Sequence, residues 1–253
     1  MSGWVDSHCH LFMTGDPGAL LDRAEAAGVG WTVVPGVDLE TTLAARSISG
    51  EHNTRVLWSA GLHPHEASLW GEQGARIRAL AIDADAVGEC GLDYYRNLSP
   101  PEAQRVAFTE QLSLAKELDK PVIVHCRDAF ADVYEALGLA DLGQKAVMHC
   151  WTGGPRWTRR FVDLGVTFSF AGPVTFENGD TVRLGASVAP PHRTMVETDT
   201  PYLTPPPDRR APNEPANVIR VGEALAAVWG IEVDEVARLS TAAATAVFGG
   251  PPR

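Results

Sequence analysis

The sequence predicts an α/β protein of the (β/α)8 TIM-type barrel class, organised as one domain over residues 1–253. Eight short apolar runs rich in β-branched residues alternate with stretches of helical periodicity. The length of 253 residues also suits such a barrel, which typically takes roughly 250. The main alternative is an open doubly wound sheet. That fold usually carries a glycine-rich phosphate loop after its first strand, and this sequence has none.

The expected strands are short, and each becomes polar at its carboxyl end. Their regular separation by helix-length segments is typical of parallel strands joined by helices. We expect strands at residues 4–7, 31–34, 56–61, 86–91, 121–125, 145–149, 166–170 and 194–198.

The segments between the strands carry helix boundary signals. The first follows Asp16, a suitable N-cap, and ends at Gly28. Another begins at Pro101 and then has Phe108 and Leu112 at helical spacing. A proline-rich loop, residues 201–215, follows the last strand and is expected over the active face. The expected helices are residues 17–27, 39–49, 72–83, 101–118, 129–138, 157–164, 181–186, 215–229 and 233–248.

Composition restricts the class of function. A net charge of −11 argues against broad coating of nucleic acid, which needs a basic surface. No apolar run is long enough to cross a bilayer, and the N-terminus does not resemble a signal peptide. We therefore expect a cytoplasmic protein without a membrane partner, and a monomer by default. The four cysteines form no CxxC pair, and we expect small buried thiols behind the site.

Histidines and acids follow the strands at their carboxyl ends, where barrel enzymes gather their catalytic groups. His8 and His10 are two residues apart, so on a strand they point to the same face. His125 and Arg127 have the same relation, so Arg127 can face the same cavity; we expect it to contact a phosphate there, the alternative being a surface ion pair. Six of these residues form the candidate cluster: His8, His10, Glu89, His125, His149 and Asp199.

Burying so many ionisable groups without a counter-charge is unfavourable, and divalent metal removes that difficulty. Imidazole with carboxylate suits zinc and other first-row metals, whereas carboxylate-rich sites favour magnesium or manganese. Four histidines and two acids exceed the needs of one tetrahedral site. The cluster therefore predicts two divalent metal ions that share a bridging carboxylate, with Mg, Mn and Zn left open. Such a pair activates water and stabilises the attacking and leaving oxygens.

The motifs together resemble the TatD-family metal-dependent deoxyribonucleases of the amidohydrolase-like superfamily. They occur in the family's order and span roughly residues 4–217. The segments that carry the resemblance are Asp6-Ser7-His8-Cys9-His10-Leu11, Gly61-Leu62-His63-Pro64-His65, Gly88-Glu89-Cys90-Gly91-Leu92-Asp93-Tyr94-Tyr95, residues 121–129, residues 149–154 and Glu197-Thr198-Asp199-Thr200-Pro201-Tyr202. Two positions depart from the family pattern: Trp151 replaces a usual phenylalanine, and Ala243 replaces a common asparagine.

The resemblance implies a distorted barrel with a two-metal hydrolytic site. One metal would be held by His8, His10, Glu89 and Asp199, and the other by Glu89, His125 and His149. Glu89 would bridge the two metals, and His63 would contact the scissile phosphate. Asp199 would act as the general base for the attacking water.

Other polar residues near the motifs have expected supporting roles. Glu197 is expected to be a buried structural partner, and His65 a structural residue. Asp93 either orients a ligand histidine or caps the following loop. Tyr94, Tyr95, Trp151 and Tyr202 border the site, and each either stacks on bases or packs against loops.

The sequence supports three functions. The first is a metal-dependent hydrolase that cleaves phosphodiester bonds of DNA at strand ends, an exonuclease-type deoxyribonuclease. The second is a small-molecule amidohydrolase, lactonase or phosphoesterase that uses the same binuclear site. The third is a non-catalytic scaffold stabilised by metal, which the complete ligand set disfavours.

Overall fold

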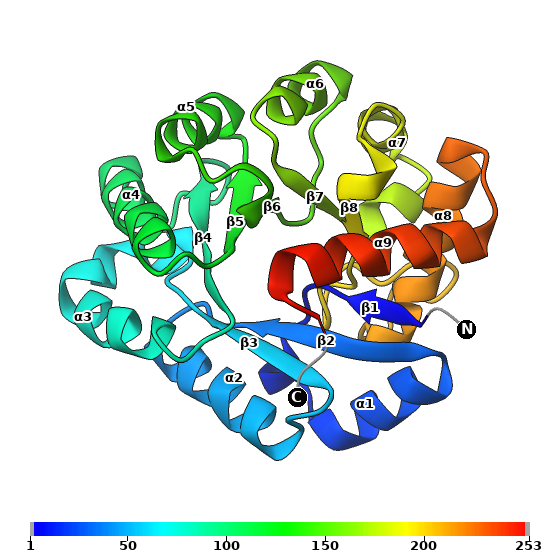
Figure 1. Cartoon of the computed structure of the whole chain (residues 1–253), viewed down its shortest axis with the longest axis horizontal. Coiled ribbons are helices and arrows are strands. Elements are labelled where there is room, and N and C mark those ends of the chain that lie inside the picture. The colour runs from blue at the N-terminus through cyan, green and yellow to red at the C-terminus, as the bar shows by residue number, and fades with distance from the viewer. Residues whose placement is uncertain (1–2, 251–253) are drawn as a thin grey trace.

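The computed structural model describes residues 3–250, and eight strands form one parallel sheet in chain order (Figure 1). They are the eight expected strands, with ends shifted by at most two residues. The strands are β1 (Trp4–Asp6), β2 (Val29–Pro35), β3 (Val56–Ala60), β4 (Ala86–Asp93), β5 (Val122–Arg127), β6 (Ala146–Met148), β7 (Thr167–Phe170) and β8 (Thr194–Val196).

The sheet closes between its first and last strands. The Ser7 amide donates to the Val196 carbonyl at 3.1 Å, and the His10 amide donates to the Thr200 carbonyl at 2.7 Å. The strands are uneven, since β1, β6 and β8 have three residues each and β4 has eight. The predicted (β/α)8 barrel is therefore confirmed, in the uneven form that the resemblance implies.

Helices surround the barrel, and several begin at the signals read from the sequence. The Asp16 carboxylate accepts from the Ala19 amide at 3.1 Å, and another helix begins at Pro101. Asp38 and Thr41 form a capping box that was not predicted from the sequence. Residues 215–217, expected as helix, form a separate 3-10 turn before the helix that begins at Val218. The helices are α1 (Pro17–Ala26), α2 (Leu39–Glu51), α3 (Trp70–Ala81), α4 (Pro101–Glu117), α5 (Phe130–Ala140), α6 (Pro155–Asp163), α7 (Asp180–Ala186), α8 (Val218–Trp229) and α9 (Val233–Phe248).

The last helix closes the amino-terminal end of the barrel. Figure 1 shows α9, in red, crossing in front of the strands. Its Ala243, Ala244 and Val247 pack into a buried cluster with inward side chains such as Val5 and Ile123. This end of the barrel is therefore a filled apolar core, and the position that departs from the family pattern, Ala243, belongs to it.

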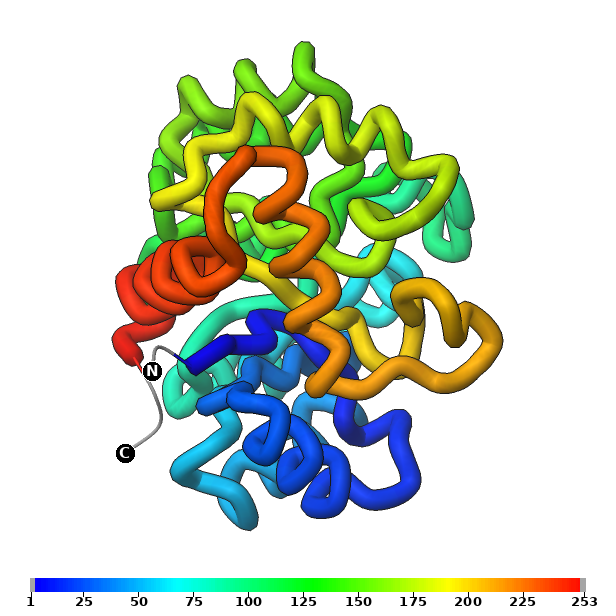
Figure 2. The backbone as a smooth tube through the Cα atoms, turned by 90° about the vertical axis from the view of Figure 1, so that its right-hand side faces the viewer, coloured from blue at the N-terminus to red at the C-terminus, as the bar shows by residue number. Residues whose placement is uncertain are grey.

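The proline-rich loop lies at the opposite end, as expected. In Figure 2 the segment after β8 extends on the side away from α9. Asn213 holds it, donating through Nδ2 to the Thr198 carbonyl at 2.9 Å and to the Tyr202 carbonyl at 2.8 Å. These bonds fix the loop against the carboxyl ends of the strands.

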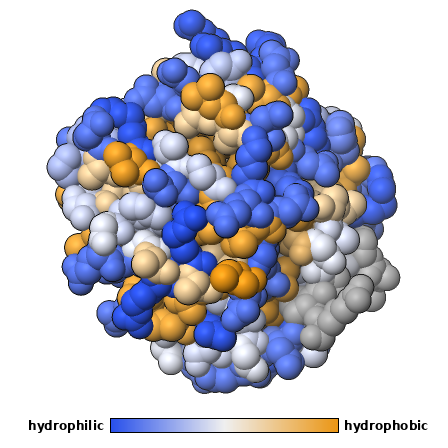
Figure 3. Space-filling model, turned by 60° about the vertical axis from the view of Figure 1, so that its left-hand side comes forward, coloured by the Kyte–Doolittle hydropathy of each residue, from blue (hydrophilic) through white to orange (hydrophobic). Residues whose placement is uncertain are grey.

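Hydrophilic residues predominate on the face in Figure 3, where apolar residues form small separate patches. Among residues 3–250, none of the helices has both the length and the apolar character needed to span a bilayer.

Candidate metal centre

A cavity of about 740 Å³ opens at the carboxyl ends of the strands. His8 is fully buried, and its ring stacks on that of His149 with centroids 3.7 Å apart. The structure thus brings all eight predicted site residues together. The seven that line the cavity are His10, His63, Glu89, His125, Arg127, His149 and Asp199.

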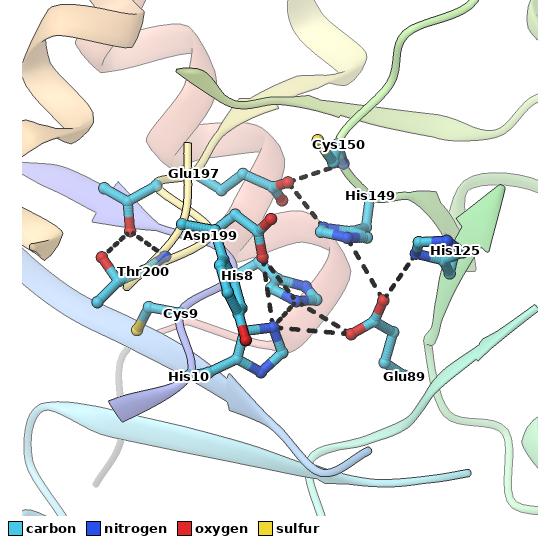
Figure 4. Close-up of polar contacts among 12 residues, drawn as sticks. His8, Cys9, His10, Glu89, His125, His149, Cys150, Glu197, Asp199 and Thr200 are labelled. Carbon is cyan, nitrogen blue, oxygen red and sulfur yellow. Dashed lines mark hydrogen bonds and ion pairs between the residues drawn. The ribbon is translucent and has the colours of Figure 1, made fainter. Parts of the chain in front are cut away.

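The two histidines of the first strand converge, although β1 ends before them. Pairing continues past the strand end through a bridge between Cys9 and Thr200 and through a bond from the Asp199 amide to the His8 carbonyl at 2.9 Å. As a result, His8 Nε2 and His10 Nε2 lie 3.2 Å apart. Cys9 points away from them (Figure 4). The convergence expected from the His-x-His spacing is present.

Four donor atoms lie close together: His8 Nε2, His10 Nε2, Glu89 Oε2 and Asp199 Oδ1. Glu89 Oε2 lies 3.3 Å from His8 Nε2 and 3.9 Å from His10 Nε2. Asp199 Oδ1 lies 3.7 Å and 3.3 Å from the same two nitrogens. Ligands bound to zinc at about 2.0–2.1 Å are separated by about 3.4 Å on a tetrahedron. The donors and their spacing therefore fit a divalent metal.

The second oxygen of Glu89 faces a different set of donors. Oε1 lies 3.1 Å from His125 Nδ1, 3.4 Å from His149 Nε2 and 3.3 Å from His63 Nε2. Figure 4 shows the Glu89 carboxylate between His8 and His10 on one side and His125 and His149 on the other. Glu89 thus has the arrangement of a carboxylate that bridges two cation sites.

The buried groups of the cluster balance one another's charge. Burial favours the neutral form of Glu89, but the nearby rings of His63, His149 and His8 hold the pKa of its carboxyl well below the usual range. Burial lowers the pKa of His149, but Glu197 and Glu89 outweigh burial and raise it to about 10. Without metal, protons held by His149 and His125, whose pKa values are raised, therefore offset the carboxylates, and metal binding would displace such protons.

Glu197 orients His149 from behind. Its Oε1 accepts from His149 Nδ1 at 2.8 Å and from the Cys150 amide at 2.7 Å. This leaves His149 Nε2 directed at Glu89, the role that a carboxylate behind a ligand histidine usually has. Glu197 is fully buried, so its expected role as a buried structural partner is confirmed. Among the described residues, Nδ1 of His8 and of His10 has no such partner.

His63 has a distinct protonation state. Burial lowers the pKa of its ring to about 4, so the ring is neutral at pH 7. Its Nδ1 accepts from the His65 amide at 3.2 Å, which assigns the proton of the neutral ring to Nε2. A protonated Nε2 donates a hydrogen bond and cannot ligate a metal. This geometry suits the expected phosphate contact better than a ligand role.

Asp93 both contacts a candidate ligand histidine and caps the following loop, the two roles that the sequence left as alternatives. Its Oδ2 accepts from His65 Nε2 at 2.8 Å and from His125 Nε2 at 3.3 Å. Its Oδ1 accepts from the amides of Tyr95 at 3.0 Å and Arg96 at 2.8 Å. One carboxylate therefore orients a candidate ligand and also caps the turn after β4. His65 has the expected structural role, bound to Asp93.

Two buried glutamines of α4 support the site and were missed by the sequence reasoning. Gln104 accepts from the Asp93 amide at 2.8 Å and donates to the Ser99 carbonyl at 2.8 Å. Gln111 accepts from the Leu62 amide at 2.8 Å and donates to the Leu62 carbonyl at 3.0 Å, next to His63. The sequence did contain a signal for them. Gln104 and Gln111 lie on the same helix face as the apolar Phe108, and a polar side chain on a buried face needs a hydrogen-bond partner.

Glycines let β4 approach β5 closely enough for Glu89 and His125 to meet. Gly88 has φ +117°, and Gly91 has φ +140°, conformations that other residues rarely adopt. A side chain on Gly91 would collide with the His125 carbonyl oxygen. Gly88, directly before Glu89, and Gly91, two residues after it, are therefore required by the backbone conformation and by the close approach of β5.

Two expectations for cysteines are wrong. Cys126 and Cys150 are half-buried and line the cavity instead of lying behind it. At Cys150 the backbone is left-handed, with φ 43°, so strand alternation does not apply. Cys126 lies where β5 extends beyond β6, which ends at Met148. Cys9 and Cys90 are buried as expected.

The four aromatic residues differ in burial. Trp151 is fully buried, donates to Thr158 Oγ1 at 2.8 Å and packs against Phe161, so it is a packing residue. Tyr94 is half-buried and donates to Asp132 at 2.6 Å. Tyr95 and Tyr202 are exposed, and Tyr202 lines the cavity.

A parallel eight-stranded barrel with a histidine–carboxylate centre at its carboxyl end defines the class: the protein is a metal-dependent hydrolase. The model of the family described as TatD related DNase matches residues 5–249, and the chain belongs to this family.

Individual relatives agree with the family match. The chain is 36% identical over 247 residues to an uncharacterized metal-dependent hydrolase, YcfH, of Escherichia coli, covering 94% of this chain and 92% of that protein. It is 40% identical over 210 residues to the 3'-5' ssDNA/RNA exonuclease TatD of a Rahnella species, covering 78% of each. The crystal structure of YjjV, a TatD homologue from Escherichia coli, superposes with a TM-score of 0.89 at 28% identity and covers 98% of both chains.

Proposed function

We propose that the protein is a metal-dependent exonuclease that hydrolyses phosphodiester bonds at the ends of single-stranded DNA. The observation that carries the proposal is the Glu89 carboxylate, whose two oxygens face two separate groups of donors. Relatives named 3'-5' ssDNA/RNA exonucleases support the choice of substrate.

The proposed ligands are those that the resemblance implies. His8, His10, Glu89 and Asp199 would hold one cation, and Glu89, His125 and His149 the other. Bound in this centre, two divalent cations would activate a water molecule and stabilise the charge that develops on the phosphate oxygens. Magnesium, manganese and zinc are all compatible with this mixed set of donors.

The charge of the cavity supports the need for cations. Its lining includes the carboxylates of Glu66, Glu89, Asp93 and Asp199, against the arginines Arg96 and Arg127. A phosphodiester chain is also anionic, and these carboxylates offset the charge of the arginines and of protonated His149, so the protein alone would attract it only weakly. Divalent cations would make the local field positive at the position where the phosphate must bind.

Three side chains would act directly on the substrate. Histidines around Asp199 keep the pKa of its carboxyl low in spite of burial, so it is ionised and can accept the proton of the attacking water. His63 would donate from Nε2 to a phosphate oxygen. Arg127 would contact the phosphate backbone at the mouth of the cavity. As the water oxygen bonds to phosphorus, the bond to the leaving oxygen breaks.

The proposal predicts that Asp199→Asn lowers the rate of DNA cleavage by about 100-fold or more, because the amide cannot accept the proton. Purified protein is stripped of metal, supplied with magnesium, manganese or zinc, and offered end-labelled linear single-stranded DNA. Asp22→Asn, in an exposed ion pair on α1, is the matched control and should keep full activity.

A circular single-stranded DNA separates the finer alternatives. An exonuclease leaves the circle intact, whereas an endonuclease linearises it. Equal cleavage by the wild type and Asp199→Asn would contradict the proposal. Turnover of lactones, amides or small phosphoesters without DNA cleavage would instead favour a small-molecule hydrolase that uses the same centre.

A further inference from the structure

Arg127 and Tyr95 form a stacked pair at the rim of the cavity. Arg127 ends β5 and lines the cavity, while Tyr95 follows β4. The guanidinium carbon of Arg127 lies 4.0 Å from the centroid of the Tyr95 ring. Stacking occupies the face of the guanidinium and leaves its N–H edge free to bind an anion.

Tyr95 is exposed, yet its backbone is firmly held. The residue is 61% exposed, whereas its amide donates to Asp93 Oδ1 at 3.0 Å. The preceding residue is tied to β5, since the Tyr94 amide donates to the Arg127 carbonyl at 2.9 Å. One face of the ring is covered by Arg127, so the accessible area belongs to the rest of the ring. A rigid, exposed aromatic ring beside a cavity is a surface suited to a planar ligand.

We propose that Tyr95 stacks on an unpaired nucleobase of the substrate strand, with Arg127 contacting the adjoining phosphate. This inference rests on the proposed nuclease function and specifies how the substrate is recognised. Every base has a π-face, so stacking is tolerant of sequence, and a base within a duplex is already stacked on its neighbours. The platform formed by Tyr95 and Arg127 would therefore select single-stranded ends.

Asp93 links this platform to the candidate metal centre. Its Oδ1 holds the amides of Tyr95 and Arg96, and its Oδ2 accepts from His125 Nε2 at 3.3 Å. Because both contacts use one buried carboxylate, the distance from the platform to the centre is fixed. The stacked base should then belong to one nucleotide at a constant position relative to the scissile bond.

Tyr202 is the rival ring at the mouth. It is 52% exposed and lines the cavity, but its hydroxyl contacts Met13 Sδ at 3.4 Å, and its ring meets that of His10 edge-on at 6.3 Å. Among the described residues, no arginine stacks behind it, so the geometry favours Tyr95 as the platform.

An abasic scan tests the proposal. A single abasic nucleotide is moved along the cleaved end of a single-stranded oligonucleotide, and kcat and KM are measured at each position. For the wild type we expect one position at which loss of the base raises KM by about 5- to 100-fold. For Tyr95→Leu the penalty at that position should disappear, since base and abasic site then bind alike. Tyr95→Phe should retain the penalty.

A second arginine–tyrosine pair, away from the cavity, provides the control. Tyr134 on α5 also lies under an arginine, with the Arg160 guanidinium carbon 4.4 Å from its ring, but Arg160, unlike Arg127, does not line the cavity. Tyr134→Leu should leave the abasic profile unchanged. Thermal unfolding of each variant verifies that it is folded.

The outcomes separate the two proposals. If the wild type cleaves oligonucleotides but Tyr95→Leu keeps the wild-type abasic profile, the platform is overturned and the nuclease function stands. A penalty abolished by Tyr202→Leu instead of Tyr95→Leu overturns it in the same way. If the wild type cleaves no oligonucleotide with any metal, the nuclease function itself fails.

Discussion

Glu89 is the residue on which the centre depends, because its two oxygens face different donors. Oε2 lies 3.3 Å from His8 Nε2, and Oε1 lies 3.1 Å from His125 Nδ1. The residue is 2% exposed, so its charge must be balanced by its neighbours. Two groups of histidines therefore share one buried carboxylate.

The carboxylates that orient the two candidate ligand histidines, His149 and His125, differ in how closely they hold them. His149 is oriented by Glu197 through a bond of 2.8 Å, and His125 by Asp93 through a bond of 3.3 Å. We predict that Glu197→Gln weakens metal binding by about 10- to 100-fold while the protein stays folded. The reason is that a neutral amide orients the His149 ring less firmly than a carboxylate and makes it a less basic ligand. Calorimetric titration of the metal-free protein with manganese or zinc measures the effect.

The matched control for that experiment is Glu235→Gln, which removes an exposed carboxylate paired with Arg238 on α9. Its metal affinity should equal that of the wild type. An unchanged affinity in Glu197→Gln would mean that His149 does not ligate metal or needs no orienting partner.

At the scale of elements, β4 and β5 have the longest paired register, and glycine makes that pairing possible. We predict that Gly91→Ala lowers the free energy of unfolding by at least about 2 kcal/mol, since φ +140° is strained for alanine and its Cβ would collide with the His125 carbonyl. Metal affinity should fall as well, because His125 moves with its backbone. Thermal and denaturant unfolding provide the measurement.

Gly30 in β2 serves as the control, because it is a strand glycine with space for a side chain. An added Cβ would meet only the Trp4 carbonyl, at 3.8 Å, an ordinary contact. Gly30→Ala should change the free energy of unfolding by no more than about 0.5 kcal/mol. Equal effects of the two substitutions would show that close β4–β5 packing is not what Gly91 provides.

Regular elements were predictable because periodicity is a local property of the sequence. All eight strands and their helices follow from apolar runs that alternate with stretches of helical periodicity, and from boundary signals such as Asp16 and Pro101. The convergence of His8 and His10 also followed from spacing alone. The alternation of side chains along a strand did not predict the position of Cys150. This residue follows β6 and has a left-handed backbone that turns the chain, and a single sequence gives little indication of such a residue.

The supporting contacts were harder to predict, because they join residues distant in sequence. Gln111 binds the backbone of Leu62, and Asp93 Oδ2 accepts from both His65 and His125. Spacing shows that such residues share a face, but it does not show which pairs meet. For the same reason, the sequence left Asp93 with two alternative roles, and the structure assigns both.

At the scale of the whole molecule, the apolar core that stabilises the barrel and the cavity that would carry out the reaction lie at opposite ends. The amino-terminal end is filled by apolar side chains and covered by α9, whereas the carboxyl end holds the cavity and the ionisable cluster. The chain carries a net charge of −11, so attraction for an anionic substrate must arise locally, at the proposed cations and at Arg96 and Arg127.

The central claim is that one carboxylate bridges two metal ions. Anomalous diffraction from crystals grown with manganese or zinc tests it most directly. We predict two separate peaks: one bound by His8, His10, Asp199 and Glu89 Oε2, and one by His125, His149 and Glu89 Oε1. A single peak, or two peaks that share no contact with Glu89, would contradict the account.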